Sequence, residues 1–528
     1  MRRIGEFLKS ARAPWLFAAA LALSASALAV WFGALNQDEG WYLYAAQMVR
    51  AGKLPYRDFF YTQGPAMPFV YALLAPVWGM DSPLRGLLGG RVVTLALGLL
   101  STLCAVALAR RLVPPARRAL AGFAVFALLG GNLYHLYFTA IPKTYALGAL
   151  FLLGGLLLVA CGLRARRGGP ALLAAGGFAL ACATGTRISL LLVLPAVGFT
   201  LLFRFRAFRW AFLWFGLGGV AGLALTYGFF AYDPASLRGL LAAQRYHAAR
   251  GGFDPFFALG SVSRLARGYA ALGVVLFAFL CARGAAAEGR RDAVASALSW
   301  MLGLGFAAVF LLQLSAPFPY DDYQVPVMGL LTVLVAAGFA RRAAAPLPAM
   351  WFVALAAGLV SFSSPLLQEW AAYAPDRFWS RKKEMTDLAK LRRAGRELRA
   401  LDPQGTTLLT QDLYLAVETG RTVPPGLEMG PFSYFPDLSD EEARAVHVLN
   451  RDGMARLVDA APCTAAAFSG YGFAIAAPTC AQVPPEERTR LFDLLRARYE
   501  LRAREPDFGQ HATTLLLLTR RDGKEGAK

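Results

Sequence analysis

Residues 86–109 read GLLGGRVVTLALGLLSTLCAVALA, and Arg110 and Arg111 follow them directly. An apolar stretch of about 20 residues can cross the hydrocarbon core of a bilayer as a helix, so this segment predicts a membrane span. Similar apolar segments run roughly along 14–35, 118–140, 143–163, 170–186, 187–203, 209–231, 265–283, 293–314, 323–340 and 347–364. The sequence therefore predicts a polytopic α-helical membrane protein with about 11 spans.

The composition agrees with this interpretation. Of the 528 residues, 57% are hydrophobic and 17% are charged, with a net charge of +20, whereas soluble chains average about 45–50% apolar and about 25% charged residues. A disordered chain would combine charge with low hydrophobicity, and a soluble nucleic-acid-binding protein would not carry repeated apolar segments of membrane length. We therefore expect a lipid bilayer as a partner and no nucleic acid.

The charges divide the chain into two parts. Residues 365–528 hold 23 Lys and Arg and 23 Asp and Glu, so the net charge of +20 lies entirely within residues 1–364. The apolar segments also end at this point. We therefore predict a multi-span membrane domain over 1–364 and a soluble domain over 365–528, which is large enough to have a core of its own.

The soluble part contains both helical and strand-like patterns. Helical apolar spacing with dense charge is found at 380–401 and 485–503, and strand-like segments at 406–410, 464–477 and 513–519. These patterns predict a small α/β domain, which could hold an acceptor or cap the membrane site. Cys463 and Cys480 also lie here, and because an exported domain permits a disulfide, their pairing is a hypothesis.

Basic residues indicate the orientation in the membrane. They form six clusters, at the N-terminus and after every second apolar segment: Arg2/Arg3/Lys9/Arg12, Arg110/Arg111/Arg117/Arg118, Arg164/Arg166/Arg167, Arg204/Arg206/Arg209, Arg283/Arg290/Arg291 and Arg341/Arg342. Because basic loops stay in the cytoplasm, one rule places all six there. The N-terminus is then cytoplasmic and the C-terminal domain extracytoplasmic, in a cell (inner) membrane. The first apolar run is longer than the about 7–15 residues of a signal-peptide core, so we interpret it as an uncleaved anchor.

Acidic residues of the membrane part gather on the opposite side. Eight lie in or beside outward loops: Asp38, Glu39, Asp58, Asp81, Asp233, Asp254, Asp321 and Asp322. A charge at the bilayer centre costs about 2.5–3.5 kcal/mol, which explains their absence from span centres but not their bias to one face. Longer outward loops explain part of this bias, and the remainder predicts an outward-facing polar site.

The first outward loop, residues 36–85, is the segment richest in reactive side chains. It contains Asn-Gln-Asp-Glu-Gly-Trp-Tyr from Asn36 and Leu-Pro-Tyr-Arg-Asp-Phe-Phe-Tyr from Leu54. Residues 42–51 predict a short interfacial helix. The apolar stretch 66–80 is only about 15 residues long and contains prolines, so we interpret it as a membrane-surface or re-entrant helix.

Asp38 and Glu39 lie where the first span meets water. Neighbouring residues on a helix diverge by about 100°, so these carboxylates are poorly placed to share one proton. They can do two jobs instead: one as a general base on an acceptor hydroxyl, the other binding a sugar hydroxyl, a cation or a backbone amide. The alternative is a solvated acidic pair at a helix end. The pair could also hold a divalent cation, although nothing in the sequence requires one.

Several short motifs are distributed along residues 14–340. They are the acidic pair followed by Gly40, Trp41 and Tyr42; Tyr-Arg-Asp-Phe-Phe-Tyr at Tyr56–Tyr61; Gly64-Pro65; the basic span end 108–112; Thr186-Arg187 ahead of Leu194-Pro195; and Tyr323 to Pro326. With these motifs the chain resembles the membrane-embedded GT-C glycosyltransferases. The likeness is greatest to the group containing protein O-mannosyltransferases and the lipid A aminoarabinose transferase.

The resemblance implies sugar transfer at the outer membrane face. The donor would be a polyprenyl-phosphate-linked sugar, the acceptor a hydroxyl of a lipid, glycan or protein, and the anomeric carbon would be inverted. The catalytic residues implied are Asp38 as base and Glu39 beside it. Family members often carry a second acid at the start of the span beginning here near 143, but this chain has Lys143 and Tyr145 there. That role falls to Asp58 or to no residue.

A departing polyprenyl phosphate needs cations nearby, because negative charge develops on its oxygens. Arginine suits this role, since its planar fork binds phosphate at two points. We predict Arg57, Lys143, Arg187 and Arg264 as donor phosphate-binding residues, and Tyr42, Tyr56, Asp58, Tyr61, Asp321, Asp322 and Tyr323 as substrate-binding residues. The alternatives are a span-end anchor for Arg187, headgroup contact for Arg264, and an acidic helix cap formed by residues 320–323.

Two rival classes of function stay open on the sequence alone. A transporter or flippase of lipid-linked sugars would place ionisable residues at mid-membrane on broken helices, often in repeated halves, and the sequence shows no clear repeat. A non-catalytic lipid-binding or assembly protein would tolerate the loss of Asp38.

Overall fold

The computed structural model describes residues 10–248, 253–282, 292–373, 381–470, 472–473, 483–510 and 512–521. It divides into two compact units. The first, here the span unit, comprises Met1–Val30, Thr94–Gly228 and Gly252–Glu369. The second, here the loop–tail unit, comprises Trp31–Val93, Phe229–Gly251 and Trp370–Lys528. The first outward loop thus groups with the C-terminal tail.

The predicted polytopic architecture is confirmed. Within the described residues, 8 helices are long and apolar enough to cross a membrane, or up to 10 if each of two bent pairs is one span. The 8 are α2 (Arg12–Phe32), α6 (Leu87–Arg111), α9 (Thr144–Gly162), α10 (Gly169–Thr186), Arg206–Tyr232 with α12 (Arg209–Leu223) and α13 (Phe229–Tyr232), α17 (Ala293–Leu314), Asp321–Arg342 with α18 (Val325–Arg342), and Pro346–Ala371 with α19 (Pro346–Phe362) and α20 (Pro365–Ala371).

Three expected spans differ from straight membrane-length helices. The segment 265–283 is not one straight span, because α15 (Pro255–Gly268) and α16 (Ala270–Cys281) form a pair bent by 81°. The segment 187–203 forms a shorter apolar helix, Ile188–Arg204, which contains α11 (Val193–Phe199). Arg187 precedes it in extended backbone conformation, with φ −147° and ψ 115°, and so ends α10. The segment 118–140 forms most of the second bent pair, at 66°, which contains α7 (Arg118–Val125) and α8 (Leu133–Ala140).

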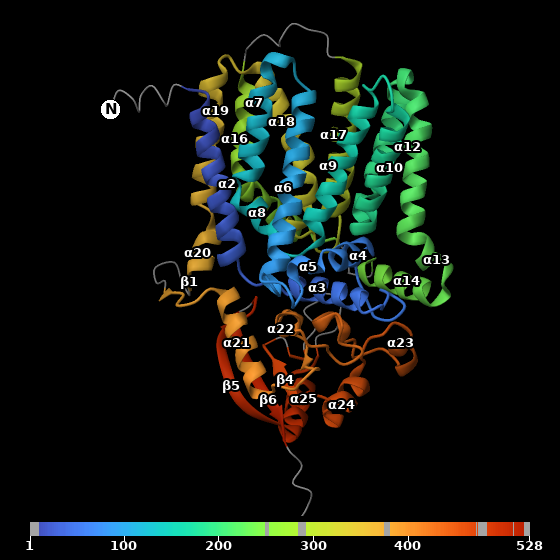
Figure 1. Ribbon diagram of the computed structural model, residues 1–528, viewed down its shortest axis with the longest axis vertical. Coiled ribbons are helices and arrows are strands. Elements are labelled where there is room, and N and C mark those ends of the chain that lie inside the picture. The colour runs from blue at the N-terminus through green and yellow to red at the C-terminus, as the bar shows by residue number, and fades with distance from the viewer. Residues whose placement is uncertain are drawn as a thin grey trace, which may run out of the picture. The chain divides into compact units, whose positions relative to one another are not determined.

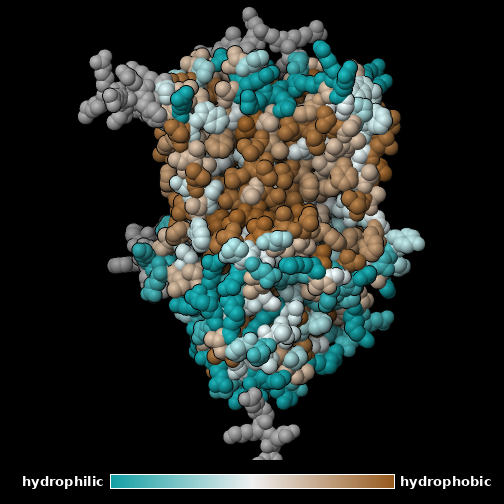
Figure 2. All heavy atoms as spheres, in the orientation of Figure 1, coloured by the Kyte–Doolittle hydropathy of each residue, from teal (hydrophilic) through white to brown (hydrophobic). Residues whose placement is uncertain are grey.

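The outer faces of the span helices are apolar. Leu23 of α2, Leu103 of α6, Leu213 of α12 and Leu359 of α19 are exposed. Figure 2 shows hydrophobic side chains gathered over the middle of these helices, with hydrophilic side chains beyond the end at which α6 leads to α7. A band of exposed apolar side chains of this kind suits contact with lipid tails.

Glycines allow two span helices to approach closely. A Cβ atom at Gly177 of α10 would lie 2.1 Å from the carbonyl oxygen of Phe215, and one at Gly218 of α12 would lie 1.9 Å from that of Ala174. No side chain fits at such distances. Helix packing therefore explains Gly177 and Gly218, as it explains small residues in other membrane bundles.

The tail forms the predicted α/β fold. Its main sheet has the order β3-β4-β6-β5, with β3 and β4 parallel and the other pairs antiparallel. The strands are β3 (Leu409–Thr410), β4 (Ala465–Phe468), β5 (Tyr499–Phe508) and β6 (Thr513–Arg520), and a separate antiparallel pair is formed by β1 (Ala372–Tyr373) and β2 (Arg381–Lys382). Figure 1 shows α21 (Asp387–Leu401) lying along β5.

The remaining helices of the loop–tail unit are short. They are α3 (Gln37–Arg50), α4 (Ala66–Leu73), α5 (Ala75–Trp78), α14 (Pro234–Ala248), α22 (Leu413–Thr419), α23 (Asp440–Ala445), α24 (Arg451–Ala460) and α25 (Pro485–Arg498). The expected helix at 485–503 ends at Arg498, because Tyr499 begins β5 and pairs with Arg520 of β6. Cys463 is a buried thiol, and Cys480 lies outside the described residues.

The first loop packs tightly on the tail. A Cβ atom at Gly40 of α3 would lie 2.3 Å from the backbone nitrogen of Tyr414 in α22. The rings of Trp41 and Phe432 meet edge to face, with centroids 4.6 Å apart. Val423 donates its backbone N–H to the Tyr44 hydroxyl at 2.9 Å. These contacts fix α3, which carries the acidic pair, against the tail.

Candidate functional site

The acidic pair begins α3, and local hydrogen bonds orient its two members differently. The Asn36 side chain accepts a hydrogen bond from the backbone N–H of Asp38 at 3.1 Å, and Glu39 accepts one from the N–H of Asn36 at 2.9 Å. This reciprocal arrangement is a capping box. It turns Glu39 back toward the helix start and leaves Asp38 on another face, partly exposed.

Glu39 is buried in an ion pair with Arg91 of α6. The guanidinium donates from Nε and Nη2 to the two carboxylate oxygens, both at 2.7 Å, and neither side chain is exposed. Arg91 also donates to the carbonyl oxygens of Gly33 and Ala34 at 3.0 Å. Both oxygens of Glu39 are thus occupied, so the pair does not fit a cation that needs both carboxylates. Asp38 is the member of the pair that solvent reaches.

Sequence reasoning missed Arg91. Its signal was a lone arginine within the apolar segment 86–109. Because an unpaired buried charge is costly, such a residue predicts an acidic partner. The sequence does not identify Glu39 as that partner, since the two lie 52 positions apart.

Arg57 and Asp58 bond to each other. The Arg57 guanidinium donates from Nε and Nη2 to the two Asp58 oxygens, each at 3.0 Å, and the Leu54 N–H donates to the same carboxylate at 2.7 Å. Burial raises the pKa of Asp58, but these hydrogen bonds and the Arg57 charge outweigh it, so the pKa lies below its ordinary value. Asp58 is therefore ionised, and Arg57 is exposed at the edge of the unit.

Tyr42, Tyr56 and Tyr61 form a buried aromatic cluster. Tyr61 meets Tyr42 and Tyr56 edge to face, with centroids 6.2 and 6.0 Å apart. The Tyr56 hydroxyl donates to the carbonyl oxygen of Gln63. All three side chains pack inside the loop–tail unit, which accounts for them structurally, and their role in substrate binding stays a prediction.

The span unit brings together three of the predicted cations and the second acidic pair. Asp322, which precedes α18, accepts hydrogen bonds from Lys143 Nζ at 2.8 Å and from the Tyr145 hydroxyl at 2.9 Å. The segment that begins at 143 has no carboxylate of its own. Asp322, from another span, places a carboxylate next to Lys143. Cation and acid lie 179 positions apart in sequence.

Asp321 points to a different set of partners. It accepts hydrogen bonds from Arg264 Nε of α15 at 2.8 Å and from the Tyr134 hydroxyl of α8 at 2.6 Å. Arg264 also donates to Ser261 Oγ at 2.8 Å. Its side chain is 42% exposed, so the guanidinium is held in place and can still reach a ligand.

Arg187 completes this group. Its guanidinium lies over the Tyr145 ring at 5.1 Å and over the Tyr323 ring at 4.6 Å, both within cation–π range. The interpretation of residues 320–323 as an acidic helix cap therefore describes only part of the contacts of this segment. Asp321, Asp322 and Tyr323 each contact a different cation.

A cavity of about 480 Å³ adjoins this cluster. Its polar wall includes Tyr134, Arg264, Arg267 and Asp321, and its apolar wall includes Leu133, Phe138, Ala270, Val360 and Leu366. Two guanidinium groups beside an apolar surface suit a ligand that has an anionic head and a hydrocarbon tail. Tyr134 was missed from the sequence, where its only signal is a polar aromatic within an apolar run.

No metal centre is found among the described residues. They contain no group of three or more His, Cys, Asp or Glu side chains placed to hold a metal ion. The side chain of His247 and the residues 249–252 lie outside the described residues.

Comparison with known proteins identifies the fold. The chain is similar to the structure of ArnT from Cupriavidus metallidurans bound to undecaprenyl phosphate, with a TM-score of 0.60 and 14% identity over 96% of this chain and 98% of that chain. It also matches the oligosaccharyltransferase of Archaeoglobus fulgidus in the apo form, with a TM-score of 0.48 and 12% identity over 85% of this chain and 69% of that chain. No family model and no curated protein matches the sequence. The likeness to ArnT shows that this multi-pass membrane protein has the GT-C fold.

Proposed function

We propose that this chain is a membrane glycosyltransferase that transfers a sugar from a polyprenyl-phosphate donor to a hydroxyl of a lipid, glycan or protein acceptor. The observation that carries the proposal is the convergence of Lys143, Arg187 and Arg264 on residues 321–323. Arg264 and Asp321 of this cluster also line a cavity with basic and apolar walls. The ArnT structure with the same fold is bound to undecaprenyl phosphate, which supports a donor of this class. The reaction would take place at the outer face of a cell (inner) membrane, with the N-terminus cytoplasmic.

The cation cluster suits the donor phosphate. Three cations face the two carboxylates of Asp321 and Asp322, which leaves one positive charge, and Arg267 and Glu369 on the cavity wall balance each other. Arg264 is the best candidate for direct contact, because it is both bonded to Asp321 and part of the cavity wall. Guanidinium groups in a site with little water stabilise the charge that develops on a departing phosphate.

The carboxylates have separate roles in this proposal. Asp322 and Asp321 position Lys143 and Arg264, whereas Asp38 acts as the general base. The acceptor oxygen attacks the anomeric carbon, its proton passes to Asp38, and the bond from carbon to phosphate oxygen breaks with its electrons on the phosphate. Attack opposite the leaving group inverts the anomeric centre. Glu39, whose oxygens are both bonded to Arg91, has a structural role.

The test is sugar transfer in vitro from defined polyprenyl-phosphate sugars, with Asp38→Asn compared with wild type. We expect kcat to fall by about 10²–10⁴-fold, the usual contribution of a general base. The matched control is Asp81→Asn, which removes an exposed carboxylate from the same loop and should leave kcat unchanged. Full activity of Asp38→Asn would overturn the assignment of the base.

A divalent cation stays a prediction for this reaction. No step above depends on one. Transfer measured in the presence of excess EDTA tests the requirement, and a full rate would show that the reaction needs no divalent cation. A loss of activity that Mg²⁺ or Mn²⁺ restores would show that a cation arrives with the substrate.

A further inference from the structure

A second basic site lies at the other end of the span unit. Lys143 precedes α9 and Arg164 follows it, so this site is separated from the Asp322 cluster by the length of α9, about 28 Å at 1.5 Å per residue. It is a cavity of about 360 Å³ lined by Ala107, Arg110, Arg111, Arg118 and Arg164. We call it the arginine pocket.

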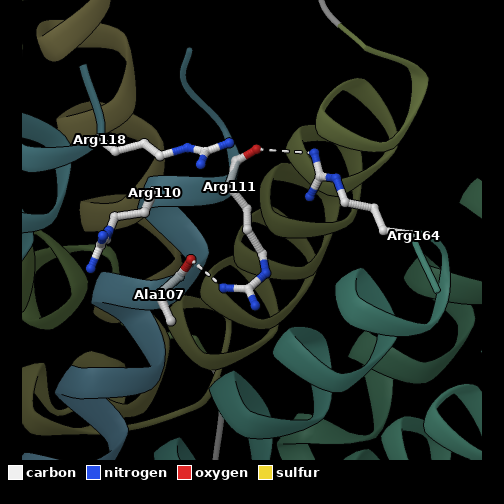
Figure 3. A pocket seen from close by; sticks show the side chains of 5 residues that line it. All are labelled: Ala107, Arg110, Arg111, Arg118 and Arg164. Atoms are coloured by element: carbon white, nitrogen blue, oxygen red, sulfur yellow. Dashed lines mark hydrogen bonds between the residues drawn. The ribbon is translucent and has the colours of Figure 1, made fainter. Parts of the chain in front are cut away.

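The arginine pocket is built where the ends of three helices meet. Arg110 and Arg111 end α6, Arg118 begins α7, and Arg164 follows α9. Figure 3 shows Arg118 and Arg164 approaching the Arg111 backbone from opposite sides. The Arg164 guanidinium donates to the Arg111 carbonyl oxygen at 3.2 Å.

Two of the four arginines are held firmly by protein groups. Arg111 donates to the Ala107 carbonyl oxygen at 3.0 Å and to Cys161 Sγ at 3.2 Å (Figure 3). Arg164 donates to the Asp292 carboxylate at 2.9 Å. Arg111 therefore keeps a fixed geometry but has no carboxylate partner among the described residues.

The other two arginines have no anion beside them among the residues that the structure describes. Within the described part of the chain, neither Arg110 nor Arg118 has a hydrogen-bond or ion-pair partner. The stem of Arg110 packs against α7, where a Cβ atom at Gly122 would lie 3.2 Å from Arg110 Cδ. Asp292 neutralises one of four guanidinium charges, so the pocket carries an excess of about three positive charges. Like charges gathered around one hollow repel each other unless an anion lies between them.

The surroundings place this pocket at the boundary between lipid tails and headgroups. Leu100 and Leu103, about two turns before Arg110 on α6, are exposed apolar side chains. Trp15 of α2 is partly exposed and packs on Phe123 of α7, with ring centroids 5.0 Å apart. Tryptophan and arginine beside an apolar surface mark the interface of a bilayer, and basic pockets between spans bind anionic headgroups.

We propose that the arginine pocket binds the phosphodiester headgroup of an anionic phospholipid. The bound lipid would neutralise Arg110, Arg111 and Arg118 and so stabilise the junction of α6, α7 and α9. The retention of positive charge in cytoplasmic loops explains why basic residues occur in this region. It does not explain why four of them line one cavity while Arg166 and Arg167, in the loop after α9, lie exposed outside it.

The test measures lipid binding to the full-length protein in detergent by native mass spectrometry. Wild type is titrated with phosphatidylglycerol, with phosphatidylcholine and with inorganic phosphate. The test variant is Arg110→Gln/Arg118→Gln, and the matched control is Arg166→Gln/Arg167→Gln, which removes the same charge from outside the pocket. Because each arginine near an anionic surface contributes about 1 kcal/mol, we expect the test variant to bind phosphatidylglycerol at least about tenfold more weakly.

We expect wild type to bind phosphatidylglycerol more tightly than phosphatidylcholine. The test variant should lose this preference, and the control should keep it within about twofold. Equal losses in both variants would overturn the proposal, since binding would then follow surface charge alone. Displacement of the lipid by an equal concentration of inorganic phosphate would show a site for the free anion and not for a lipid. If the test variant does not fold, two measurements still decide the question. They are lipid binding by Arg110→Lys/Arg118→Lys, which keeps the charge, and the lipid preference of wild type.

Discussion

The carboxylate of Glu39 receives two hydrogen bonds of 2.7 Å from the guanidinium of Arg91, and neither side chain is exposed. Asp38, next to it in sequence, is partly exposed and takes no part in this pair. The helical turn thus separates two adjacent acids into one that is buried in an ion pair and one that solvent reaches.

Removing one partner of this buried pair should destabilise the loop–tail unit. Arg91→Met leaves the Glu39 carboxylate buried without its cation, which costs about 3–5 kcal/mol. We expect a marked fall in the thermal midpoint of the purified protein, together with loss of activity. Replacement of both, Arg91→Met with Glu39→Leu, should recover part of the lost stability, because no unpaired charge is left. A single variant as stable as wild type would contradict the structural role of Glu39.

Loss of Arg264 should weaken donor binding. Arg264→Gln keeps hydrogen-bonding capacity toward Asp321 but removes the charge that faces the cavity. Since hydrogen bonds to charged groups contribute about 1.5–3 kcal/mol, we expect KM for the polyprenyl-phosphate sugar to rise by about 10–100-fold. Steady-state kinetics at varied donor concentration checks this.

Arg245→Gln is the matched control for that measurement. It removes an exposed arginine from α14, which belongs to the loop–tail unit and not to the unit that contains the Asp321 cluster. If both variants raised KM equally, general attraction of the anionic donor to the protein surface would explain the effect, and Arg264 would have no special role.

The close contact between α3 and α22 predicts that Gly40 tolerates no side chain. In Gly40→Ala the new Cβ would lie 2.3 Å from a backbone atom of Tyr414, which cannot move aside as a flexible side chain would. Overpacking of this kind costs about 1–3 kcal/mol, and we expect a lower thermal midpoint. Gly216→Ala is the control, because no atom lies within 4 Å of its new Cβ and alanine favours the helix. A Gly40→Ala variant as stable as the control would contradict the packing of the first loop on the tail.

Glu428 predicts a pH-dependent stability of the loop–tail unit. Burial raises its pKa from 4.5 to about 7. Below pH 4.5 this carboxyl is protonated in both the folded and the unfolded state. Between the two pKa values the folded state binds more protons, so the free energy of unfolding falls as pH rises. Above about pH 7 the loss is complete, at about 3 kcal/mol.

The variant Glu428→Gln should remove this contribution. We expect its stability relative to wild type to increase between pH 5 and pH 8, the window set by the pKa of about 7. Denaturant unfolding at a series of pH values checks the difference. Glu441→Gln, which changes an exposed carboxylate, should follow wild type across the same range. A constant difference between Glu428→Gln and wild type would contradict the raised pKa.

The spans could be predicted because their signal is local. A run of apolar residues has to leave water wherever the rest of the chain lies, so α2, α6 and α18 follow from the sequence nearly to their ends. The α/β character of the tail followed in the same way from short-range patterns. The structure departs from the predicted bounds where local patterns are interrupted. A bend at Tyr269 breaks the segment 265–283, and the pairing of β5 with β6 ends the helix at Arg498.

The sequence by itself thus determined the membrane spans, the kind of tail and the types of residue that a phosphate site needs. Only the tertiary structure decided which charges meet. Glu39 pairs with Arg91, Asp322 with Lys143 and Asp321 with Arg264, across separations of 52, 179 and 57 residues. The physical reason is that hydrophobic burial depends on the local run of side chains, whereas an ion pair depends on a few ångströms between atoms that only packing brings together.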